Sequence, residues 1–146
     1  MMHSFLLQEG TWIARGHYFD DMERTLLLEG MVRITHLESL WLNEGEAEIK
    51  MGDNQIKIKH RYEIIPFEKG KNQTTWESVN PDLGILRGRS IIVADTIIST
   101  CCSEKGECSG VEFHIRINDV HYKNRGILLK GNDKLSSWSV DLQKLS

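Results

Sequence analysis

The feature that most constrains this chain is a series of segments in which apolar and polar residues alternate, running from Trp12 almost to the C-terminus. Alternation with a period of two is typical of β-strands that bury one face. Clear examples span residues 12–19, 46–51 and 55–63, and polar turns such as Gly52-Asp53-Asn54 separate them. The pattern predicts about nine or ten strands and no helix between consecutive strands.

Short connections favour pairing between strands that are neighbours in sequence, and closure of the sheet removes its exposed edges. We therefore expect an all-β fold, a single antiparallel up-and-down β-barrel that forms one domain over residues 1–146. Only residues 3–9 have a weak helical pattern. Ser4 is expected to cap a short helical turn there, with Phe5 and Leu6 facing inward to plug one end of the barrel.

Composition excludes several classes of partner. The net charge of −3 disfavours nonspecific binding to nucleic acid, which needs clustered basic residues. No segment approaches the roughly 20 apolar residues of a membrane helix, so membrane insertion is not expected. The N-terminus lacks the basic region of a secretory signal, and three cysteines are an odd number for a disulfide framework. A cytoplasmic location is the expectation.

Gly10-Thr11-Trp12 follows the short N-terminal turn directly. Together with the number of strands, this motif resembles the calycin superfamily, which contains the lipocalins and fatty-acid-binding proteins. The resemblance implies that Trp12 crosses the closed end of the barrel and stacks on an arginine of a late strand, for which Arg125 is our choice. The part from Trp76 to Leu142 also resembles small uncharacterised bacterial lipocalin-like proteins, through Asn80-Pro81-x-Leu83-Gly84, Gly110-x-Glu112, Arg125-Gly126-x-Leu128 and Ser136-Ser137-Trp138. This likeness implies a fold and no activity.

Several side chains are candidates for contact with a ligand inside such a barrel. They are Trp12, Tyr62, Trp76, Arg87, His114 and Arg116. The tryptophans are more simply core residues, because large aromatic side chains dominate buried area wherever they lie.

The orientation of residues 111–117 stays open. The simpler interpretation turns Val111, Phe113 and Ile115 inward and leaves Arg116 in solvent. In the alternative, His114 and Arg116 face the interior, where Arg116 would bind a ligand carboxylate through two hydrogen bonds.

The remaining titratable residues give no signature of a metal site, a cofactor or a catalytic centre. Cys101, Cys102 and Cys108 flank a turn at residues 104–107, and a three-residue loop would place Cys102 opposite Cys108. Free thiols are the simplest interpretation, with a reversible disulfide or a metal site as alternatives. The six histidines lie on different segments without metal-binding spacing.

Three functions remain open. The first is the binding of a small, mainly hydrophobic ligand, fatty-acid-like or a tetrapyrrole, with an acidic or polar head. The second is an enzyme on the same barrel, an isomerase, a lyase or a haem-dependent catalyst. The third is an interaction module with a filled barrel, an apolar outer patch around Ile91, Ile92 and Val93, and homodimers formed through an edge strand.

Overall fold

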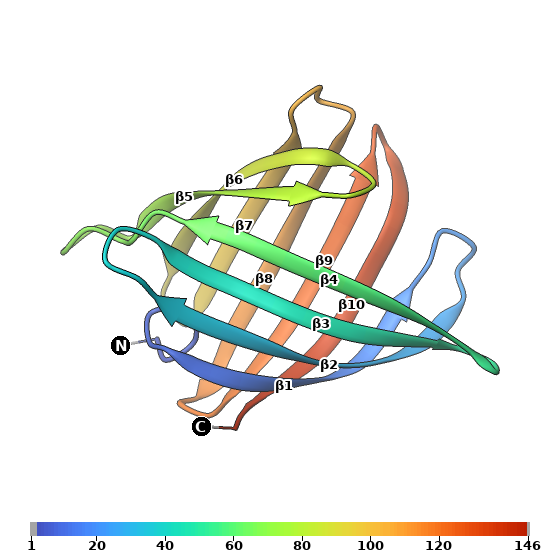
Figure 1. Cartoon of the computed structure of the whole chain (residues 1–146), viewed down its shortest axis with the longest axis horizontal. Helices are drawn as coiled ribbons and strands as arrows, with labels where there is room; N and C mark the ends of the chain where they lie inside the picture. Colours follow the sequence, from blue (N-terminus) through green and yellow to red (C-terminus); the bar gives the residue numbers. More distant parts are fainter. Residues whose placement is uncertain (1–2, 146) are drawn as a thin grey trace.

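The computed structural model describes residues 3–145, which form a closed barrel of ten antiparallel strands (Figure 1). The strands are β1 Gly10–Phe19, β2 Thr25–His36, β3 Trp41–Met51, β4 Asn54–Ile64, β5 Gln73–Asn80, β6 Gly84–Val93, β7 Thr96–Ser103, β8 Cys108–Asn118, β9 His121–Lys130 and β10 Asp133–Lys144. Each strand pairs with its neighbour in sequence, and β1 pairs with β10 to close the sheet. The predicted all-β up-and-down barrel is confirmed. No helix long and apolar enough to span a membrane occurs in residues 3–145.

Alternation along the strands decides which side chains face the interior. Trp12 and Ala14 on β1 are buried, as is Ile34 on β2, in agreement with their apolar character. On β8 the order is reversed: His114 is buried at 7% exposure, whereas Ile117 is 48% exposed. The simpler interpretation of residues 111–117 is therefore wrong, and the polar face of this strand points inward.

The apolar side chains of β8 instead pack against apolar side chains of neighbouring strands on the outer face of the sheet. Phe113 lies opposite Ile98 of β7, and Val111 lies opposite Ile127 of β9. Cross-strand apolar pairs of this kind stabilise a sheet on either face. This pairing explains how β8 can turn its polar side inward without leaving its apolar side chains isolated.

One end of the barrel is sealed by the N-terminal segment. Residues 4–8 form turns and bends rather than the predicted helical turn, because Leu6 has a positive φ of 71° that ends any helical course. Phe5 and Leu6 are 1% and 3% exposed, so the predicted plug is present. The phenol oxygen of Tyr122 holds the segment, 2.6 Å from His3 Nδ1 and 3.2 Å from the Ser4 amide, which donates to it.

The weakest seam of the barrel runs between β4 and β5. These strands are in register at Glu63↔Glu77 and Ile64↔Trp76, and Ser78 Oγ adds a hydrogen bond of 2.7 Å to the Arg61 carbonyl oxygen. Beyond that point β4 follows β3 away from β5, as Figure 1 shows. Ile56 and Ile58 on the departing stretch are 47% and 41% exposed. Ile58, which lines the cavity, is therefore partly open to solvent beside the seam.

Candidate functional site

The barrel encloses a cavity of about 470 Å³, within the usual range for sites that hold small molecules. A filled barrel is therefore excluded. Its walls are mainly apolar, and they include Leu28, Val32, Ile58, Ile64, Leu86, Leu128, Val140 and Leu142. Phe5 and Leu6 of the N-terminal plug form its floor, and Asp82 and Leu83 of the β5–β6 turn contribute near the open end.

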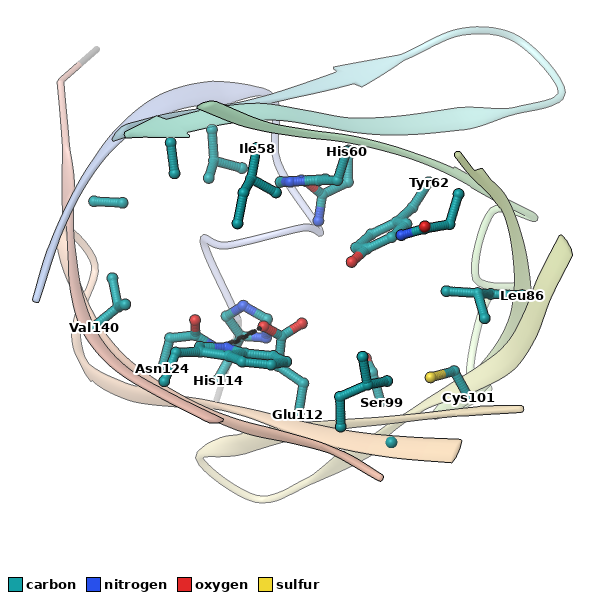
Figure 2. Close-up of a pocket in the computed structure, with 18 of the residues that line it drawn as sticks. Ile58, His60, Tyr62, Leu86, Ser99, Cys101, Glu112, His114, Asn124 and Val140 are labelled. Atoms are coloured by element: carbon teal, nitrogen blue, oxygen red, sulfur yellow. Dashed lines mark hydrogen bonds between the residues drawn. The ribbon is translucent and has the colours of Figure 1, made fainter. Parts of the chain in front are cut away.

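A carboxylate lies on the inner wall formed by β8, β9 and β10. Glu112 Oε2 accepts a hydrogen bond of 2.9 Å from Trp138 Nε1 and one of 3.1 Å from Asn124 Nδ2 (Figure 2). The Asn124 amide group also donates to the Phe113 carbonyl oxygen at 3.0 Å. Both donors approach the same carboxylate oxygen, so Glu112 is held in one orientation while Oε1 keeps its acceptor capacity.

The opposite wall, on β4 and β5, carries a row of rings, of which Figure 2 labels His60 and Tyr62. His60 stacks on Tyr62 with their ring centroids 4.7 Å apart, and Tyr62 lies 4.8 Å from Trp76. The His60 ring is fixed by a hydrogen bond of 2.8 Å between Nε2 and Asn43 Oδ1. These contacts present ring faces and edges to the cavity at defined positions.

Burial controls the protonation of the side chains in the cavity. It lowers the pKa values of His60 and His114, because a charged imidazole loses its hydration there, and the Glu112 carboxylate opposes that shift. The His114 ring also stacks on Phe5 at 4.5 Å. Burial raises the pKa of the Tyr62 phenol, and that of the Cys101 thiol to about 11. At neutral pH the histidines, Tyr62 and Cys101 are therefore uncharged.

The structure brings together three of the six predicted ligand contacts. Tyr62, Trp76 and His114 line the cavity. Trp12 lies beneath the plug, fully buried against Phe5 and Tyr122. Whether any of these side chains contacts a ligand stays a prediction.

The structure does not bring the two predicted arginines to the cavity. Arg87 is on the outer face of β6, where it forms ion pairs with Glu77 and Glu104. Arg116 lies on the inner face of β8, but beyond the plug, where it forms an ion pair with Asp119 at 2.6 Å. Among the described residues that line the cavity, Lys59 is the one lysine or arginine. A carboxylate head at the base of the cavity would therefore meet Glu112 rather than an arginine.

The predicted stacking of Arg125 on Trp12 is wrong. Trp12 makes edge-on ring contacts with Phe5 at 5.4 Å and with Tyr122 at 5.5 Å. Arg125 follows the inward-facing Asn124, so alternation turns it outward, and its guanidinium donates to the Asn124 carbonyl oxygen at 2.9 Å.

The cysteines are free thiols in the structure. The turn between β7 and β8 has four residues, which brings Ser103 beside Cys108 and sets Cys102 opposite Ser109. The three-residue loop that would have placed Cys102 opposite Cys108 is therefore not formed. Among residues 3–145 no group of three His, Cys, Asp or Glu side chains is arranged to hold a metal ion.

Sequence reasoning missed the central residue of the site, Glu112, along with its partner Asn124, and it treated its other partner, Trp138, as a core residue. A signal was present, because Glu112 lies two residues before His114 and so shares its face of β8. The hydrogen bond from Trp138 could not be foreseen, because it joins β8 and β10 across the intervening β9.

No family model and no curated protein matches the sequence. Among solved structures, the chain is similar to an S-type phycobiliprotein lyase, CpeS, from Guillardia theta, with a TM-score of 0.64 and 10% identity. That match covers 94% of this chain and 88% of the other. A putative AttH from Nitrosomonas europaea (TM-score 0.34, 10% identity, 93% of this chain and 50% of the other) and an N-terminal dehydratase from the difficidin assembly line (TM-score 0.29, 6% identity, 94% and 78%) are more distant. At such identities the likeness to the lyase shows a common barrel fold.

Proposed function

We propose that this protein binds a small, mainly apolar molecule that carries N–H donors, and that a tetrapyrrole is the class that fits best. The observation that carries the proposal is Glu112, a carboxylate held by Trp138 and Asn124 on the wall of an apolar cavity of about 470 Å³. The proposal keeps the ligand-binding function expected from the sequence and replaces an acidic head by a hydrogen-bond donor.

Affinity in such a cavity comes largely from apolar contact. Each methylene group of a ligand that leaves water contributes about 0.8 kcal/mol, and aromatic walls favour stacking on a ligand with an extended ring system. The row formed by His60, Tyr62 and Trp76 supplies that surface on one wall. Specificity then depends on the few polar groups in the cavity.

Glu112 is the strongest of these polar groups. A hydrogen bond to a charged partner contributes about 1.5–3 kcal/mol, more than a neutral one. The pyrrole N–H groups of a tetrapyrrole are suitable donors, and its propionates would extend toward solvent, because Lys59 already forms an ion pair with Glu46 at 3.2 Å. The carboxylate of a fatty acid, in contrast, would be repelled by Glu112.

The similarity to a phycobiliprotein lyase supports the proposal only through the barrel that the two proteins share. At 10% identity that barrel does not define a ligand, so the choice of ligand class depends on the cavity itself.

The test is equilibrium binding of biliverdin and of palmitate, followed by tryptophan fluorescence. We expect the wild type to bind biliverdin more tightly than palmitate, and Glu112→Gln to weaken biliverdin binding at least about tenfold. Palmitate binding should improve in the same variant. Glu44→Gln, the same change on the outer face beside Arg61, is the matched control and should leave both affinities unaltered. Preference for palmitate in the wild type, unaffected by Glu112→Gln, would contradict the proposal.

A second candidate function is an enzyme on the same barrel, because Glu112 and the buried His114 lie two residues apart on one inner face. A carboxylate beside a neutral imidazole is a common arrangement for moving protons. Incubation with biliverdin, followed by mass and absorbance analysis of the recovered ligand, separates the two functions. A binding protein returns the ligand unchanged, whereas an enzyme converts it and loses that activity in His114→Gln.

A further inference from the structure

Three glycines of the barrel lie directly opposite aromatic rings on neighbouring strands. Gly45 of β3 pairs with His60 of β4, Gly88 of β6 with Trp76 of β5, and Gly126 of β9 with Trp138 of β10. All three rings belong to residues that line the cavity.

Each ring occupies the space that a side chain on its glycine would need. A Cβ atom on Gly126 would lie 2.1 Å from Trp138 Cζ2, and one on Gly45 would lie 2.3 Å from His60 Cε1. Gly88 is a mixed case, because its Cβ atom would lie 2.7 Å from Trp76 Cε2 but only 1.8 Å from the Thr100 carbonyl oxygen of the adjacent strand. The rings therefore lie flat against the glycine backbone instead of standing out into the interior.

Other glycines in the strands have a different role. A Cβ atom on Gly16 or Gly30 would meet backbone atoms of the adjacent strand, at 2.1 Å from the Ser139 oxygen and 2.2 Å from the Glu46 oxygen. Those two positions, and in part Gly88, serve the close approach of strands. Gly126 is the clearest opposite case, because the three nearest atoms all belong to the Trp138 indole.

The positions of the three rings give the cavity its shape. In the barrel order, β4 and β5 lie across the ring of strands from β9 and β10. His60 and Trp76 thus flatten one wall while Trp138 flattens the opposite wall, where its Nε1 also orients Glu112. The cavity lies between these two walls.

We propose that Gly45 and Gly126 are specificity-determining positions, each of which keeps an aromatic ring against the wall so that the cavity admits a flat, conjugated ligand. The inference depends on the proposed ligand-binding function for its consequence and on the glycine–ring contacts for its structure. Gly126 has an additional effect, since displacement of Trp138 also releases Glu112.

The experiment uses Gly126→Ala, with two readouts. The first is the indole Nε1–H resonance of Trp138, which the bond to Glu112 should protect from hydrogen exchange in the wild type; the variant should lose that protection. The second is biliverdin affinity, which we expect to fall at least about tenfold. Ser139→Ala is the control, because Ser139 follows Trp138 on β10 and therefore faces outward. It should preserve the Trp138 resonance and change affinity less than about threefold.

A double-variant comparison separates ring displacement from general damage to the strand. In a Trp138→Leu background the obstacle is absent, so adding Gly126→Ala should alter biliverdin affinity and the urea midpoint far less than it does in the wild type. The two hypotheses also fail differently. Absence of biliverdin binding in the wild type would overturn the proposed function. The Trp138 indole resonance would still test whether Gly126 holds the ring in place. A Trp138 resonance that remains protected in Gly126→Ala, or an equal effect of that change in both backgrounds, would overturn the inference.

Discussion

The sealed end of the barrel is fully buried, whereas the β4–β5 seam is partly exposed to solvent. At the sealed end, Trp12 and Tyr122 are 0% exposed, and Phe5 lies between them and the cavity. At the seam, the strands share two register pairs, and Ile56 and Val79 are 47% and 77% exposed. A barrel with both ends and every seam sealed would have no entrance, and one with two open seams would lose its hydrogen-bonded wall.

The difference shows where stability and access are located in the molecule. Burial of large aromatic side chains makes the floor the most stable region. The seam has fewer backbone hydrogen bonds between its strands, so it should be the first part of the barrel to open. Opening of the seam would then leave the floor undisturbed. The following predictions test that division, starting with the largest expected effect.

Trp12→Ala should have the largest effect on stability. It removes a fully buried indole that contacts Phe5 and Tyr122, and such truncations cost about 3–5 kcal/mol in the free energy of unfolding. Val79→Ala at the exposed seam should change it by less than about 0.5 kcal/mol. Urea denaturation of the two variants measures both effects. Equal losses of unfolding free energy in the two variants would contradict the proposed difference between floor and seam.

Acidification should destabilise the barrel through His114 and His60. Their pKa values are lowered in the folded state, so below the unfolded value of 6.5 the unfolded chain binds more protons. Stability is thus complete above that pH and falls below it, by up to about 1.4 kcal/mol per pH unit for each histidine.

The contributions of the two histidines to this pH dependence should differ, because they lie in different regions of the barrel. His114 is more deeply buried than His60 and stacks on the plug residue Phe5. The other charged or titratable groups that influence the pKa values of the two histidines are Glu112, His3 and Glu44. His114→Gln should therefore flatten the pH dependence between pH 5 and 6.5 more than His60→Gln, as measured by urea midpoints across that range. A steeper profile in His114→Gln would contradict this assignment.

Ser78→Ala should have a smaller effect, confined to the seam. It removes the hydrogen bond to the Arg61 carbonyl oxygen, which costs about 0.5–1.5 kcal/mol. Amide hydrogen exchange at Glu63 and Glu77 should accelerate, while exchange at Trp12 stays slow. Ser137→Ala on β10 serves as the comparison. Faster amide exchange at Trp12 alone would contradict the idea that the seam opens independently of the floor.

Much of this fold could be predicted from the sequence, because alternation, turn residues and the need to remove sheet edges all favour one closed meander. The burial of Phe5, Leu6 and Trp12 also follows from their apolar character at the start of the chain. The orientation of β8 could not be derived, since alternation shows that two faces differ without showing which one is inward. This barrel has a polar wall inside and an apolar stripe outside at β8, contrary to the usual expectation.

The candidate site was harder to predict for a related reason. A β-turn longer by one residue reverses the facing of every side chain that follows, as the four-residue turn before Cys108 illustrates. Glu112 and Trp138 meet only because β8, β9 and β10 are adjacent in the closed sheet, which brings together residues that are 26 positions apart. Contacts of this kind depend on the register of three strands at once.

The central claim is that the ligand occupies the interior of the barrel, and two neighbouring residues of β7 test it most directly. Ser99 lines the cavity, whereas the exposed Thr100 faces outward. Titration calorimetry with biliverdin should give one binding site in the wild type and in Thr100→Phe, and an affinity at least about tenfold lower in Ser99→Phe, where the new ring fills the cavity. Unaltered binding by Ser99→Phe together with lost binding by Thr100→Phe would place the ligand outside and contradict the account.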